Sequence, residues 1–150
     1  MSEANTVLRG GRPGQWHDGV MMANADIALI PLGKAVGPMF GNLAGERSEV
    51  AAFAYFADGL RLVGARYIRG GLVDRAEVPL RTVASDALAF GANAVAVAHN
   101  HPSGNAQPSR GDIAATRMLA RVLHPLGVRV VDHWIVTRAE IRSFSALGLL

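Results

Sequence analysis

Residues 94–104 have the sequence AVAVAHNHPSG, a short apolar run that ends at two histidines and a turn. The alternating valines predict a buried strand over 94–98 that delivers the histidines. Successive side chains of a strand point to opposite faces, so His99 and His101 share one face and Asn100 points to the other. Two imidazoles on one face can bind the same metal ion.

Asp112 is the expected third ligand. Residues 102–111 contain two prolines and two glycines, turn formers that let the chain fold back on the histidines. From Asp112 onward, apolar residues recur close to helical spacing, which places Asp112 in a first helical turn. Catalytic zinc typically takes three protein ligands and leaves a fourth position for water, whose pKa falls to about 7. Two histidines and one aspartate meet that requirement.

A second interpretation of the same residues is a helix cap. Ser109 followed three positions later by Asp112 is a helix start signal, and on its own it would be a cap more often than a site. Capping explains neither the paired histidines nor the strand that delivers them. The cap and the metal site are also compatible, because a cap would position Asp112.

The spacing of these residues resembles a known motif. His99-x-His101, seven residues, Ser109, two residues and Asp112 is similar to the JAMM motif of MPN (JAB) domain metalloproteases. The longer His-Asn-His-Pro-Ser-Gly form, with Pro-Ser ahead of the aspartate, resembles the bacterial RadC group, and the resemblance extends over residues 46–150. It implies that His99, His101 and Asp112 bind Zn²⁺ and that Ser109 lies beside the reaction centre.

A metal-activated water needs a base to accept its proton. In this family the base is a glutamate on an earlier strand, and Glu49 opens the apolar run 49–57. We therefore favour Glu49 as the base. Glu46 stays the competitor, because no local spacing rule ties either residue to the zinc. The turn after this strand departs from the family pattern, since Phe56-Ala57 stands where RadC-like chains have Leu-Asp.

Residues 128–136 are almost continuously apolar, apart from Arg129, Asp132 and His133. This pattern predicts a mostly buried strand that carries a polar pair, and buried polar groups need hydrogen-bond partners. One hypothesis is a structural hydrogen bond between Asp132 and His133. The other is that His133 supports a zinc ligand from outside the coordination shell. We favour the first.

The order of elements predicts the fold class. Residues 60–67 are expected to pair with the strand 49–57 through the Asp58-Gly59 turn, and 82–91 to form a helix. Strand, strand, helix, strand, helix, strand is typical of an α/β domain with a mixed sheet flanked by helices, which the MPN resemblance also implies. We expect one domain over 27–150, beginning with a short or broken helix within 27–44, and a flexible arm over 1–26.

Composition limits the wider possibilities. The 150 residues are 50% hydrophobic and 18% charged, as expected for one globular domain. There is no cysteine, so zinc must be held by nitrogen and oxygen. The N-terminus shows no secretory signal pattern, and no apolar run is long enough to cross a bilayer. These features predict a cytoplasmic protein without a membrane partner.

The sequence is compatible with three functions, of which we favour the first because every role in its chemistry has a candidate residue. The first is a zinc-dependent hydrolase that cleaves an amide bond in a peptide or isopeptide-linked protein substrate. The second is a DNA-repair-associated or nucleic-acid-associated accessory protein, although the net charge of +3 comes from scattered arginines and aromatic residues make up only 6%. The third is an MPN scaffold without catalysis, whose usual sign would be a missing ligand.

Overall fold

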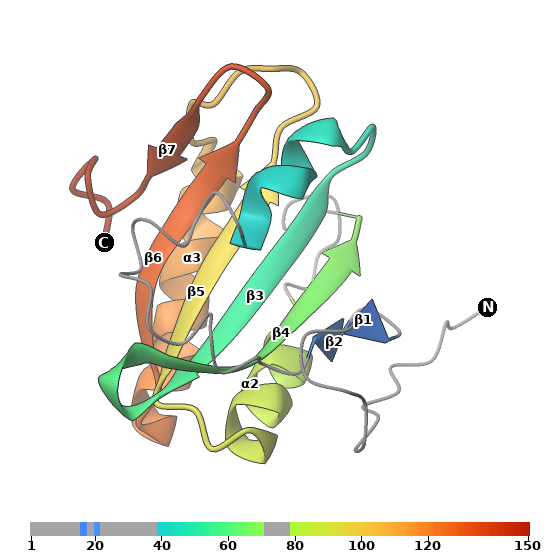
Figure 1. Ribbon diagram of the computed structural model, residues 1–150. Helices are drawn as coiled ribbons and strands as arrows, with labels where there is room; N and C mark the ends of the chain where they lie inside the picture. Colours follow the sequence, from blue (N-terminus) through green and yellow to red (C-terminus); the bar gives the residue numbers. More distant parts are fainter. Residues whose placement is uncertain (1–15, 18–19, 22–38, 71–78) are drawn as a thin grey trace.

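The computed structural model describes residues 16–17, 20–21, 39–70 and 79–150 (Figure 1). Their strands form one sheet in the order β1-β2-β4-β3-β5-β6-β7. The strands are β1 Trp16–His17, β2 Val20–Met21, β3 Val50–Ala57, β4 Arg61–Arg69, β5 Ala94–Asn100, β6 Arg129–Val136 and β7 Ile141–Ser143. The helices are α2 Leu80–Ala89 and α3 Arg110–Leu123, with 3-10 turns η2 Gly41–Gly45, η3 Asp58–Leu60 and η4 His124–Leu126.

The predicted mixed α/β fold is confirmed. β3 pairs antiparallel with both β4 and β5, whereas β5 and β6 are parallel and are joined through α3. A parallel pair needs such a crossover, and this one is a helix. Neither of the two described helices is long and apolar enough to cross a membrane.

Two predictions for the N-terminal part fall largely outside the described residues. The first is the flexible arm over 1–26. Of this segment the structure describes β1 and β2, and β2 pairs with β4. The second is the helix within 27–44, of which residues 39–40 are helical and lead into η2.

Two apolar layers bury the sheet on both faces. Helices α2 and α3 cover one face, which we call the helix face (Figure 1). Residues 39–45 cover the opposite face with Phe40 and Leu43, which pack near Trp134 of β6. Burial on both faces explains why β5 is continuously apolar up to His99.

A bulge in β6 changes which side chains reach the helix face. Val95 pairs with Val130, but the next residue of β5, Ala96, pairs with Asp132, so Val131 is an extra residue. Simple alternation from Val130 would place position 132 on the helix face. The bulge instead brings His133 to that face, beside β5.

Buried polar contacts attach α2 to the sheet. Asp86 of α2 is buried and accepts hydrogen bonds from the guanidinium of Arg66 in β4 and from the hydroxyl of Tyr55 in β3. Because the buried charge of Arg66 meets an opposite charge, this interior network is electrostatically compensated. It holds α2 against β3 and β4, on the face of the sheet that α3 also covers.

Candidate metal centre

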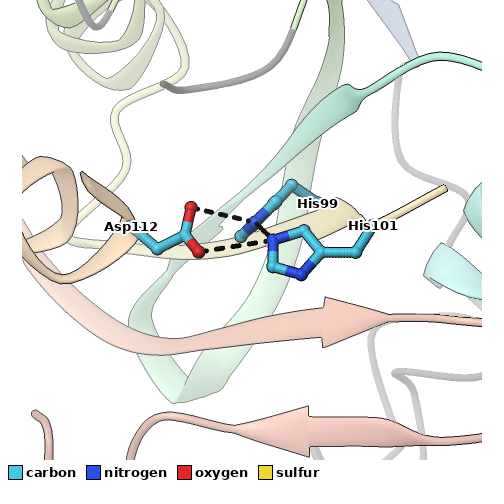
Figure 2. A group of neighbouring side chains, drawn as sticks. All are labelled: His99, His101 and Asp112. Atoms are coloured by element: carbon cyan, nitrogen blue, oxygen red, sulfur yellow. Dashed lines mark hydrogen bonds and ion pairs between the residues drawn. The ribbon is translucent and has the colours of Figure 1, made fainter. Parts of the chain in front are cut away.

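Three side chains converge where β5 meets α3 (Figure 2). His99 lies near the end of β5, His101 directly follows the strand, and Asp112 lies in the first turn of α3. The Nε2 atoms of His99 and His101 are 2.8 Å apart, and they lie 3.2 Å and 3.3 Å from the Asp112 carboxylate oxygens Oδ1 and Oδ2. Tetrahedral zinc with bonds of about 2.0–2.1 Å would separate its ligands by about 3.3 Å. The group therefore has the size of a single metal site.

The hydrogen bond on the other side of His101 shows which ring nitrogen is available to a metal. His101 Nδ1 lies 2.6 Å from the backbone carbonyl oxygen of Asn105. A carbonyl oxygen only accepts, so Nδ1 carries the hydrogen and donates it. In the neutral ring, Nε2 then presents its lone pair toward Asp112 and His99.

Asp112 has one carboxylate oxygen engaged by the protein and one that is not. Oδ2 accepts a hydrogen bond of 2.7 Å from the backbone N–H of Ser109. Oδ1 is buried and accepts no hydrogen bond among the residues that the structure describes. An anionic oxygen in such a place needs a positive partner, since burying it without one is costly. A cation between Oδ1 and the two imidazoles would satisfy it.

The pKa shifts in this cluster have the signs that favour a bound cation. Burial alone would raise the pKa of Asp112, but the adjacent imidazoles of His101 and His99 hold it well below its usual range. Asp112 is therefore ionised at neutral pH. The same carboxylate raises the pKa of His101. A negative charge that favours a proton on this ring also favours a metal ion there.

Ser109 caps α3, as predicted. Its Oγ accepts a hydrogen bond of 3.0 Å from the backbone N–H of Asp112, and the Asp112 carboxylate accepts one from the backbone N–H of Ser109. This capping box holds the Asp112 side chain toward the histidines. The Ser109 side chain is otherwise exposed, and its hydroxyl hydrogen remains available for donation.

The geometry favours Glu49 over Glu46 as the acidic residue next to the site. Ala51 of β3 pairs with His99. In an antiparallel ladder the residue two before Ala51 lies beside the residue two after His99, which places Glu49 beside His101. Glu49 is half-buried, and its charge contributes to the raised pKa of His101. Glu46, by contrast, pairs with the exposed Arg69 at 3.0 Å.

Asn100 is a residue whose role the sequence did not reveal. Its side chain points away from the histidines and binds the segment that carries Glu49. Oδ1 accepts from Val50 N–H at 2.7 Å, and Nδ2 donates to the carbonyl oxygens of Glu46 and Ser48 at 3.2 and 3.0 Å. Asn100, between the two histidines, thus holds residues 46–50 against β5. We call this set of hydrogen bonds the Asn100 clamp.

Asn100→Ala should lower the free energy of unfolding by about 1–3 kcal/mol, because it leaves the buried Val50 N–H without its acceptor. Urea denaturation measures this loss. Asn93→Ala is the matched control, since Asn93 is exposed and bonds to Asp58 at the opposite end of β5. Equal stability of the Asn100 variant and the wild type would refute the proposed clamp.

His133 contacts the metal cluster. Its Nε2 lies 2.7 Å from His99 Nδ1, and its Nδ1 lies 2.6 Å from Thr116 Oγ1. The preferred hypothesis of a structural hydrogen bond between Asp132 and His133 holds for the backbone N–H of His133, whereas the imidazole bonds to His99 and Thr116 instead. Asp132 accepts from the backbone N–H of His133 and from Ser143 and Ser145 in the C-terminal turn. Complete burial lowers the pKa of His133 well below its usual value.

A mixed sheet with a His-x-His strand end and an aspartate from the following helix defines a JAB-type domain. The chain belongs to the family described as RadC-like JAB domain, whose model matches residues 34–149. It is 42% identical over 108 residues to a UPF0758 protein of Methylibium petroleiphilum, covering 72% of this chain and 49% of the relative. It is 41% identical over 105 residues to the UPF0758 protein YkfG of Escherichia coli, covering 70% of this chain and 66% of the relative.

The chain spans about half the length of the Methylibium relative and of two further UPF0758 proteins that it matches, from Cupriavidus taiwanensis and a Polaromonas species. Their names state no activity. Membership of the family is compatible with hydrolase activity, and the buried His-His-Asp group can bind a metal.

Proposed function

We propose that this protein is a zinc-dependent metallohydrolase of the JAMM class that cleaves an amide bond in a peptide or isopeptide-linked protein. One observation carries the proposal. His99 Nε2 lies 2.8 Å from His101 Nε2 and 3.2 Å from the buried, unsatisfied Oδ1 of Asp112. Two nitrogens and one oxygen are a usual ligand set for catalytic zinc, which keeps a further position for water.

The chain also offers residues for the remaining roles in amide hydrolysis. Zinc bound at such a site supplies an acidified water and polarises a carbonyl group. Glu49, which the strand register brings beside His101, would accept a proton and pass it to the leaving amine. The Ser109 hydroxyl is free to donate to the developing oxyanion. Both roles rest on the family resemblance together with the positions of these side chains.

Metal removal and restoration test this function. The purified protein, stripped with a chelator and then reloaded with zinc, is offered peptide and isopeptide-linked lysine libraries, with cleavage followed by mass spectrometry. We expect cleavage by the zinc-loaded protein, loss of it on chelation and recovery on zinc addition. Cleavage that is identical with and without metal would contradict the proposal.

The two alternatives stay predictions. A nucleic-acid-associated role predicts DNA binding that weakens steeply with salt, and no retention of DNA at low salt would exclude it. A non-catalytic scaffold predicts no cleavage of any library member, with or without added zinc. The cytoplasmic location also stays a prediction.

A further inference from the structure

A chain of three hydrogen bonds connects two of the candidate metal ligands through the interior of the protein. The Thr116 hydroxyl lies 2.6 Å from the backbone carbonyl oxygen of Asp112, one helical turn earlier. The same hydroxyl lies 2.6 Å from His133 Nδ1, and His133 Nε2 lies 2.7 Å from His99 Nδ1. His99, Thr116 and His133 are all buried. Together with the metal cluster, these contacts close a ring.

The direction of each hydrogen bond follows from the first. A carbonyl oxygen only accepts, so the single hydroxyl hydrogen of Thr116 is donated to Asp112. Thr116 Oγ1 must therefore accept from His133 Nδ1–H. The neutral His133 ring then has a lone pair on Nε2, which accepts from His99 Nδ1–H. The remaining nitrogen of His99, Nε2, must carry its lone pair, and this is the atom that faces His101 and Asp112.

The fold contains a specific feature that places His133 in this chain. The bulge at Val131 turns His133 toward the helix face, where regular alternation would have put the neighbouring aspartate. The ring is completely buried and stacks on Phe144 with a centroid distance of 4.4 Å. Both of its nitrogens are used, one by Thr116 and one by His99. In this enclosure the ring has little rotational freedom.

We propose that Thr116 and His133 are positioning residues that hold His99 in the tautomer with its Nε2 lone pair toward the metal, and thereby set the affinity of the centre. This inference rests on the proposed metal site. Partners of this kind, which bind the second nitrogen of a ligating histidine, typically change metal affinity 10- to 100-fold.

Thr116→Val tests this chain of three hydrogen bonds, which we call the relay, with almost no change in the shape of the side chain. Valine cannot accept from His133 Nδ1–H, so His133 is driven to the other tautomer, in which Nε2–H faces His99. His99 then carries its hydrogen on Nε2 and loses the lone pair used for the metal. We expect zinc affinity, measured by competition with a chromogenic chelator, to fall 10- to 100-fold. Thr116→Ser keeps the hydroxyl and should stay within about threefold of wild type.

Two further variants separate the relay from general damage. Thr137→Val is the matched control, because Thr137 is a buried threonine whose hydroxyl bonds to Glu140 in the turn after β6. It should bind zinc as the wild type does. His133→Phe removes the acceptor for His99 Nδ1–H and should weaken zinc binding, whereas His133→Gln offers a carbonyl oxygen in its place and should restore part of it. Wild-type affinity in both Thr116→Val and His133→Phe would overturn the proposal.

Nitrogen-15 NMR of the metal-free protein at pH 8 gives a readout independent of zinc. We expect the wild-type His99 ring to carry its hydrogen on Nδ1 and the Thr116→Val ring to carry it on Nε2. A wild-type protein that shows the Nδ1 hydrogen but binds no zinc would contradict the proposed function and leave the hydrogen-bond relay intact. A His99 hydrogen on Nε2 in the wild type would refute the relay, whatever the zinc content.

Discussion

The double variant His99→Ala, His101→Ala should contain no zinc, whereas the wild-type protein should contain about one zinc per chain. Both Nε2 atoms face the Asp112 carboxylate within 3.3 Å. Removing them leaves one carboxylate, which cannot hold the ion against chelation. Inductively coupled plasma mass spectrometry of protein purified in zinc-containing buffer measures the content directly.

Thermal unfolding provides a second measure of the same loss. A ligand present at about 1,000 times its Kd stabilises the folded state by about 4.1 kcal/mol. Chelation should therefore lower the Tm of the wild type by several degrees and leave that of the double variant unchanged. His124→Ala is the control, since His124 begins the exposed turn η4 after α3. This variant should bind zinc as the wild type does. An undiminished zinc content in the double variant would show that other residues bind the metal.

Glu49→Gln should slow hydrolysis about 10²- to 10⁴-fold without loss of zinc. The amide keeps the size of the side chain but cannot accept a proton, and general base catalysis typically contributes about 10²- to 10⁴-fold to a rate. Cleavage of any library member that the wild type accepts should fall by that factor. Zinc content should not change, because Glu49 is not one of the three residues that surround the candidate site.

Glu46→Gln is the matched comparison, because it makes the same chemical change three residues away. Glu46 pairs with Arg69, whose side chain is 72% exposed, and surface pairs of this kind contribute little. We expect its rate to stay within about threefold of wild type. If Glu46→Gln loses activity and Glu49→Gln keeps it, the assignment of the base is reversed.

The metal cluster could be predicted from the sequence because its geometry is mostly local. His99 and His101 share a face through strand alternation, and the Ser109 cap places Asp112 in the first turn of α3. The loop between them is short and rich in turn formers. The order β3, β4, α2, β5, α3, β6 was predicted from the same periodicities and from the resemblance to the RadC group, whereas the short strands β1, β2 and β7 were not.

The contacts around the cluster could not be predicted because they depend on tertiary structure. The position of His133 depends on a bulge, and one extra residue reverses which side chains face α3. The Asn100 clamp spans about fifty positions of sequence, and no local pattern reports such a contact. The sequence favoured Glu49 over Glu46 only through the family resemblance, and the register of β3 against β5 adds a geometric reason for that preference.

The most direct measurement is an anomalous difference map at the zinc absorption edge, from crystals of the protein grown with zinc. We predict one strong peak within about 2.0–2.2 Å of His99 Nε2, His101 Nε2 and Asp112 Oδ1. A map without a peak between these three atoms, or with the ion bound by other residues, would contradict the assignment of this cluster as the metal centre.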